Sequence, residues 1–273
     1  MRARIDINAP QAELNIKAAK RMHLKVVGYD NRIRVLSRRV QARIEIWGCD
    51  NTLELEDDCV LPPDSFICIG APDCPAHHCR IHIGRSSSFD SDFEMRLMEN
   101  GSEINIGSEC MVAAHVRMWC TDTHAILQDG KVVNVGRSIT IGDHVWVGLN
   151  VYFSKNSGVG NQCIVGWGSL VTRTFTEDNC VIAGNPAAIV KRGVEWQRTR
   201  PNSFAHPEEE YPGFRVGGDA TYALGRLQLR LRMALYRFKM NLYSNPIKQR
   251  KYRLLTEDIN ARLAHGRGKE QSL

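Results

Sequence analysis

An aspartate and a histidine two residues apart, Asp122 and His124, are the residues best suited to chemistry in this chain. Histidine titrates near neutrality and often accepts and returns a proton. On an extended segment, residues i and i+2 share a face, so Asp122 could orient the imidazole as carboxylates do in other dyads. Asp143 is an alternative for this role, and either aspartate could instead cap its own turn. On the residues alone, His124 could be a proton acceptor or a corner histidine bonded to a backbone carbonyl.

The elements that must position this site are indicated by a repeat of six residues. Large apolar residues recur at Ile141, Val147, Phe153, Val159, Val165 and Val171, and mostly small residues follow each of them four places later. This period is neither that of a helix nor that of simple strand alternation. It predicts short strands joined by turns, with three strands in each coil and successive coils stacked as parallel sheets.

The same phase continues upstream of His124, at Ile106, Val112 and Met118. Looser apolar pairs predict further coils from about residue 24, with no role assigned to the preceding residues. A regular coil counted from Ile106 would point His124 inward. The segment Ala125–Ser138 interrupts the repeat, so it must break this register if His124 is to reach the surface.

The hexad run and the closing segment Val181–Arg192 resemble the hexapeptide-repeat acyltransferases. This resemblance implies a left-handed parallel β-helix and a homotrimer that binds acyl-coenzyme A between neighbouring subunits. The segment Cys120–Gly148 is most similar to polysaccharide O-acetyltransferases within that family. Those enzymes carry an arginine shortly before the Asp-x-His motif, where this chain has Trp119.

Further site residues follow from the repeat together with this resemblance. His144 and Trp146 flank the inward Val145 and should point outward, and the resemblance implies that Trp146 shapes the acyl slot. Basic residues suit the phosphates of coenzyme A, whereas exposed aromatic residues could equally mark a subunit contact. The predicted donor-binding residues are His144, Lys155, Gly166, Trp167, Gly168, Ser169, Thr172, Arg173, Asn185, Pro186, Lys191 and Arg192.

Composition narrows the class of protein. The 273 residues are 43% hydrophobic and 24% charged, which is typical of a folded globular chain. No run of 18 apolar residues predicts a membrane span, and the first residues lack the apolar core of a secretory signal. We therefore expect reduced cysteines and a cytoplasmic location. The cluster Cys74, His77, His78 and Cys79 does not have zinc-ligand spacing, so no metal is expected.

The predicted domain division is a β-helix over residues 1–193, a linker over 194–219 and a basic α-helical extension over 220–273. Residues 220–255 contain nine lysines or arginines and no acidic residue, and their leucines recur at helical spacing. This amphipathic helix could pack on the β-helix or a neighbouring subunit, lie on an anionic membrane, or attract an anionic polysaccharide. We find no nucleic-acid motif.

The sequence thus predicts an all-β, left-handed parallel β-helix with a helical extension, located in the cytoplasm or peripherally at the inner membrane. Its predicted reaction moves acetyl from acetyl-CoA to a hydroxyl of a bacterial surface polysaccharide or its precursor, with His124 as general base. Two alternatives stay open. One is an acetyltransferase for a sugar, serine or xenobiotic, and the other is a non-catalytic scaffold in glycan assembly.

Overall fold

The computed structural model describes residues 4–8, 12–16 and 21–198. The chain divides into two compact units, Met1–Arg198 and Thr199–Leu273. The predicted helix over residues 220–255 and most of the predicted linker therefore lie outside the described residues. The described part consists of strands joined by turns and loops, and it contains no helix long and apolar enough to cross a membrane.

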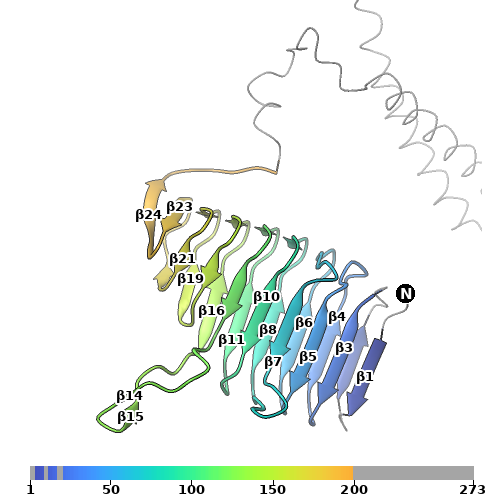
Figure 1. The fold of residues 1–273 in the computed structure, drawn as a ribbon. Helices are drawn as coiled ribbons and strands as arrows, with labels where there is room; N and C mark the ends of the chain where they lie inside the picture. Colours follow the sequence, from blue (N-terminus) through green and yellow to red (C-terminus); the bar gives the residue numbers. More distant parts are fainter. Residues whose placement is uncertain (1–3, 9–11, 17–20, 199–273) are drawn as a thin grey trace, which may run out of the picture. The chain divides into compact units, whose positions relative to one another are not determined.

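Three of the four sheets in the described residues each form one side of a tube (Figure 1), and the fourth is a two-stranded hairpin. The first sheet contains, in order, β1 (Arg4–Asn8), β3 (His23–Val27), β5 (Arg43–Trp47), β7 (Phe66–Ile69), β10 (Glu94–Leu97), β13 (Arg117–Trp119), β18 (Tyr152–Phe153) and β21 (Leu170–Val171). The second contains β2 (Glu13–Ile16), β4 (Arg32–Val35), β6 (Thr52–Leu55), β8 (Arg80–Ile83), β11 (Glu103–Ile106), β16 (Ser138–Ile141), β19 (Ser157–Val159) and β22 (Thr174–Phe175).

The third sheet contains β9 (Ser88–Phe89), β12 (Met111–Val112), β17 (Trp146–Val147), β20 (Ile164–Val165), β23 (Cys180–Gly184) and β24 (Ala187–Arg192). All of its pairings are parallel except that of β24, which turns back antiparallel on β23 and closes the edge. From β7 onward the chain passes from the first sheet to the second, then to the third, and back to the first, whereas β1 to β6 alternate between the first and second sheets. This path is a parallel β-helix.

The register of the strands confirms the six-residue repeat. Tyr152 pairs with Leu170, 18 residues later, so three six-residue units make one coil. Upstream coils are longer, and Phe66 pairs with Glu94, 28 residues later. Part of that extra length is the connection from β7 to β8, which contains the Cys74–Cys79 segment. Strand pairing is kept because the additional residues lie in the turns between sheets.

The first residues of the chain, to which the sequence pattern assigned no role, form the first coil. Residues of β1 pair in register with β3, and those of β2 pair with β4. Within the described residues, the coils therefore extend upstream of residue 24 as far as Arg4.

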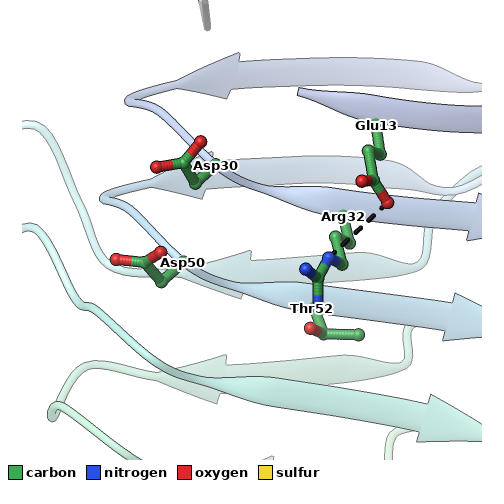
Figure 2. Close-up of a pocket in the computed structure, with 5 residues that line it drawn as sticks. All are labelled: Glu13, Asp30, Arg32, Asp50 and Thr52. Atoms are coloured by element: carbon green, nitrogen blue, oxygen red, sulfur yellow. Dashed lines mark ion pairs between the residues drawn. The ribbon is translucent and has the colours of Figure 1, made fainter. Parts of the chain in front are cut away.

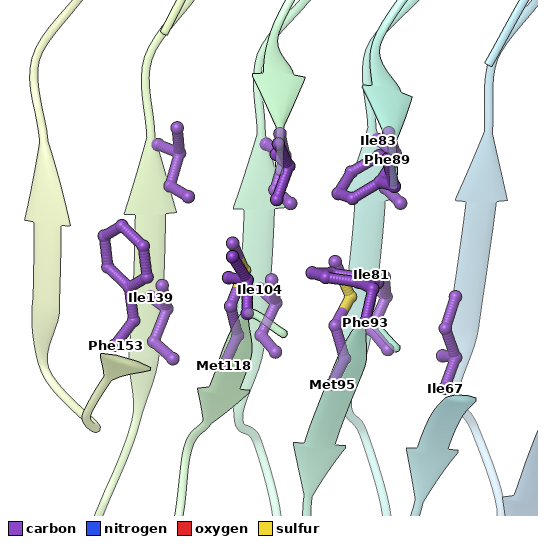
Figure 3. Close-up of a cluster of buried hydrophobic side chains, with 14 of the residues drawn as sticks. Ile67, Ile81, Ile83, Phe89, Phe93, Met95, Ile104, Met118, Ile139 and Phe153 are labelled. Carbon is purple, nitrogen blue, oxygen red and sulfur yellow. The ribbon is translucent and has the colours of Figure 1, made fainter. Parts of the chain in front are cut away.

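The core is a column of side chains inside the tube (Figure 3). Ile67, Met95, Met118 and Phe153 come from successive coils and stack along the first sheet. The large inward residues predicted between Ile141 and Val171 are all buried, as are their small partners. The six-residue pattern predicts these buried positions correctly because the apolar side chains of each coil pack against those of the next coil.

Candidate active site

The corners of the tube position the chemically useful residues. We call the connections from the first sheet to the second the first corner, those from the second to the third the second corner, and those from the third to the first the third corner. The first corner contains His124, Lys155, Thr172 and Arg173 on consecutive coils. The connection between β13 and β16 is the longest of these, and its hairpin β14 (Leu127–Gln128) and β15 (Lys131–Val132) projects from the tube (Figure 1).

His124 is exposed at the base of this loop, so the loop does break the inward register. Thr123 has a φ of 63°, a left-handed conformation that is uncommon for a β-branched residue. The turn is held by Thr121, whose Oγ1 accepts the Thr123 N–H at 2.8 Å, and by the Asp122 carbonyl, which accepts the His124 N–H at 2.8 Å. This tight turn directs the imidazole outward.

Asn134 ties the two ends of the loop together. Its Nδ2 donates to the Asp122 carboxylate and to the His124 carbonyl, both at 2.9 Å, and its Oδ1 accepts the Ile126 N–H at 2.8 Å. One amide therefore holds the backbone that leaves His124 and the Asp122 side chain that precedes it. Asn134 was not among the predicted site residues, because only the returning strand of the loop brings it beside His124.

Asp122 occupies a different position from the one predicted. Its carboxylate forms an ion pair with the Lys155 ammonium from the next coil, in addition to its bond from Asn134. No hydrogen bond joins it to the His124 ring among the described residues. Asp122 therefore does not contact the imidazole in this arrangement, and the Lys155 side chain, which is 16% exposed, is paired with Asp122. The predicted roles of Asp122 in orienting His124 and of Lys155 in binding the donor stay predictions.

Asp143 lies at the opposite end of β16 from the His124 loop, at the second corner. Its Oδ1 accepts the Ser108 N–H of the preceding coil at 2.7 Å. Within one chain Asp143 is therefore a turn residue that joins two coils, and its role as the orienting carboxylate stays a prediction. The distance spanned by β16 separates it from His124.

His144, predicted to bind the donor, is covered by an aromatic residue from the end of the first unit. The Trp196 ring stacks on the imidazole with centroids 4.2 Å apart, and its Nε1 donates to the His144 carbonyl at 2.8 Å. The His144 Nε2 also lies 3.2 Å from the Trp196 carbonyl. This contact packs His144 against Trp196 within the chain, and its role in donor binding stays a prediction. Trp196 was missed because no repeat links it to the coil that it covers.

Trp146 lies half-buried on the third sheet, as the outward position predicted for it requires. Its ring is 6.1 Å from that of Trp196. Since His124 lies at the first corner, Trp146 and His124 belong to different sides of the same tube.

A cavity of about 720 Å³ opens at His124. Thr121, Thr123, Ala125, Val132, Asn134 and Val135 line it from the loop, and Asp73, Cys74, Pro75, Met98, Glu99 and Asn100 line it from the two preceding coils. The cavity therefore extends from the imidazole toward the N-terminal end of the tube. Its walls mix apolar surface with hydroxyl, amide and carboxylate groups, which is the character of a small-molecule or saccharide pocket.

The predicted donor-binding residues fall into two groups. Thr172 and Arg173 are exposed at the first corner above His124, whereas Gly166, Trp167, Gly168, Ser169, Asn185 and Pro186 lie at the third corner or the hairpin beside it. Trp167 is 71% exposed. Lys191 and Arg192 lie in β24, where Arg192 donates to the Glu177 carboxylate at 2.9 Å. The first sheet separates the two groups within one chain.

The structure does not gather the Cys74–Cys79 residues into a metal site. Among residues 4–8, 12–16 and 21–198, no three His, Cys, Asp or Glu side chains are placed to hold a metal ion. The His77 Nδ1 instead accepts the Cys49 N–H at 3.2 Å.

Known proteins resemble this chain in sequence and in architecture, although no protein-family model matches it. A polysialic acid O-acetyltransferase of Neisseria meningitidis is 33% identical over 189 residues, which are 68% of this chain and 84% of that protein. The chain belongs to the hexapeptide-repeat acyltransferase family. It is therefore an acyltransferase, and the predicted left-handed β-helix is confirmed.

Two solved structures extend the likeness of this acyltransferase. The polysialic acid O-acetyltransferase OatWY superimposes with a TM-score of 0.62 at 27% sequence identity. The superposition covers 76% of this chain and 96% of the OatWY chain. The polySia-specific acetyltransferase NeuO superimposes with a TM-score of 0.61 at 25% sequence identity, over 73% of this chain and 90% of the NeuO chain. A polysialic acid O-acetyltransferase of Escherichia coli O1:K1 / APEC is 36% identical over 122 residues, but the match spans only 39% of that relative.

Proposed function

We propose that this acyltransferase moves acetyl from acetyl-CoA to a hydroxyl of a bacterial surface polysaccharide or its precursor. One observation carries the proposal: His124 lies exposed in a cavity large enough for a sugar residue, in a chain whose relatives are named polysialic acid and galactoside O-acetyltransferases. An exposed imidazole beside hydroxyl and amide groups suits proton transfer from a sugar hydroxyl.

In the proposed reaction, the neutral His124 imidazole accepts the proton of the acceptor hydroxyl as its oxygen attacks the thioester carbonyl. The tetrahedral intermediate then breaks its carbon–sulfur bond. Coenzyme A leaves as a thiol after the imidazolium returns the proton to its sulfur. The Asn134 network serves this step by fixing the backbone that follows His124 and the Asp122 carboxylate before it, because general-base catalysis depends on the position of the proton acceptor.

We propose a homotrimer with a donor site formed between subunits. The two groups of predicted donor residues support this, because the first corner of one copy could face the third corner of the next. The same arrangement would bring Trp146 of one subunit toward His124 of another. Exposed Arg173 and Lys191 fit the phosphates of coenzyme A, and exposed Trp167 fits a contact with its pantetheine or adenine.

Labelled acetyl-CoA incubated with candidate glycans tests the function. Mass spectrometry should find acetyl groups on oligosaccharides, with transfer to long oligosaccharides exceeding transfer to the matching monosaccharides. Efficient transfer to monosaccharides, serine or xenobiotics alone would favour a small-molecule acetyltransferase. Absence of transfer, together with no thermal stabilisation by acetyl-CoA, would favour a scaffold.

We also propose that the enzyme works in the cytoplasm. Support comes from its cysteines, all of which are free thiols, and eight of these are buried. Cell fractionation with a periplasmic marker enzyme as control would test this location.

A further inference from the structure

The first corner changes its charge at His124. In the four described connections on the N-terminal side, between β3 and β4, β5 and β6, β7 and β8, and β10 and β11, the charged residues are Asp30, Asp50, Asp73 and Glu99. None of these connections contains lysine or arginine. On the C-terminal side, the corner carries Lys155 and Arg173. His124 therefore lies between an acidic and a basic edge.

The acidic edge consists of Asp30, Asp50, Asp73 and Glu99, and Figure 2 shows its N-terminal part. Asp30 and Asp50 project from equivalent turns of successive coils, with exposed side chains. Buried asparagines fix both turns: the Asn31 Nδ2 donates to the Gly48 carbonyl at 2.9 Å, and the Asn51 Nδ2 donates to the Ala76 carbonyl at 3.0 Å. The acidic residues are thus held in line by the corner itself. Arg32 lines a pocket together with Asp30 and Asp50 and is paired with Glu13 on the adjacent second sheet, and the His78 Nδ1 lies 3.8 Å from the Asp50 carboxylate.

The acidic edge enters the cavity at His124. Asp73 and Glu99 both line the cavity, and no lysine or arginine does so among the described residues. Asp73 is exposed, and no described hydrogen bond or ion pair occupies its carboxylate. The Glu99 Oε2 accepts the Gly136 N–H at 2.6 Å, which holds this carboxylate at the base of the loop. An acceptor residue in the cavity therefore faces two carboxylates.

The basic residues of the His124 connection and of the neighbouring coils do not line the cavity. Lys131 and Arg137 are exposed on the loop itself. Lys155 is paired with Asp122, so the two cancel in charge beside His124. Arg96 lies on the outer face of the first sheet, where it bonds Glu94 and stacks 5.0 Å from the Trp119 ring. None of these four side chains lines the cavity with Asp73 and Glu99.

We infer that the sugar residue presented to His124 is uncharged, and that Asp73 and Glu99 select against anionic residues. This inference rests on the proposed function and names the class of its acceptor. Two carboxylates in a partly enclosed cavity repel a third negative charge, whereas they can accept hydrogen bonds from the hydroxyls of a neutral sugar. The acceptor class thus differs from the polysialic acid named for the relatives.

Paired acceptors that differ only in charge test this inference. Oligosialic acid and oligogalacturonic acid are each compared with their carboxyl methyl esters, which keep the free hydroxyls but lose the charge. For oligomers of three or more sugar residues, we expect the methyl ester to be acetylated with a kcat/KM at least about fivefold higher than that of the matching acid. Raising the salt concentration should reduce this preference, because salt screens the repulsion.

Variants then assign the effect to residues. Asp73→Asn and Glu99→Gln each remove a charge and keep an amide oxygen as an acceptor, so each should lower the ester preference about threefold. The matched control is Asp58→Asn, which removes an exposed carboxylate from the second corner. It should leave the preference unchanged.

The outcomes separate this inference from the function on which it rests. Acids that react as well as their esters, or an ester preference unaltered in both Asp73→Asn and Glu99→Gln, would overturn the inference and leave O-acetyl transfer intact. Acetylation of no glycan, charged or neutral, would overturn the proposed function and this inference with it.

Discussion

Asp122 and Lys155 form an ion pair between successive coils, and this pair fixes the carboxylate two residues before His124. The pair is formed across the base of the inserted loop, where Asn134 also bonds Asp122. Asp122 therefore supports the imidazole through the backbone and not through a direct bond. It anchors the turn on which His124 lies.

A double-mutant cycle tests this anchoring role. We expect Asp122→Asn and Lys155→Met each to lower kcat about tenfold, because each frees the same turn. The double variant should be no worse than the more damaging single variant. An increase in the KM for acetyl-CoA with unchanged kcat in Lys155→Met would contradict the anchoring role and restore a phosphate contact for this lysine.

Asn134 should be more sensitive, because its amide joins three backbone or side-chain groups of the loop. Asn134→Asp keeps an acceptor for the Ile126 N–H but places a negative oxygen against the Asp122 carboxylate. We expect kcat to fall by about 10- to 100-fold and the loop to be cleaved faster by trypsin at Lys131 or Arg137. Unchanged cleavage and turnover would show that the network does not hold the loop.

Trp196 lies outside the six-residue repeat, and we expect its contact with His144 to stabilise the folded β-helix. It is 6% exposed and covers His144, so Trp196→Ala should lower the free energy of unfolding by about 2–4 kcal/mol. Trp167→Ala is the matched control, because Trp167 is 71% exposed and its loss should cost less than about 0.5 kcal/mol. Urea unfolding at one fixed protein concentration measures both values. Equal losses would mean that the Trp196 contact does not stabilise the fold.

We expect the stability of the fold to decrease at alkaline pH because of its buried cysteines. Burial raises the pKa of Cys59 and Cys120 to about 12 and that of Cys110 to about 11. Since these values exceed the unfolded value of about 8.5, the stability linked to these thiols is complete below that pH and is lost as pH rises toward the folded values. Urea unfolding should therefore show stability falling above about pH 9.

Thiol labelling checks the same burial directly. Cys74 is exposed and the other eight cysteines are buried. Iodoacetamide at pH 8 should modify Cys74 alone in the folded protein and all nine cysteines in urea, as read by mass spectrometry. Rapid labelling of Cys110 or Cys120 in the folded state would contradict the packing of the core.

The repeat made the coils predictable, because every sixth residue from Ile141 to Val171 must be large and buried for the coils to stack. His124 was predictable because it stands where that repeat stops. The Asp122–Lys155 pair and the Asn134 network were not, since they join residues separated by an inserted loop of no regular period. The bond from Ser108 to Asp143 and the cover of Trp196 on His144 were not predictable either, because an outward position in a repeat does not reveal which neighbour contacts it.

The most direct test of the account is the rate of acetyl transfer by His124→Ala. The His124 ring is exposed and makes no hydrogen bond within the described residues, so the substitution should preserve the circular dichroism spectrum and the Kd for acetyl-CoA. We expect kcat for the glycan acceptor to fall by about 10²- to 10⁴-fold, which is the usual contribution of a general base. A kcat within a few fold of that of the parent enzyme would remove His124 from the mechanism.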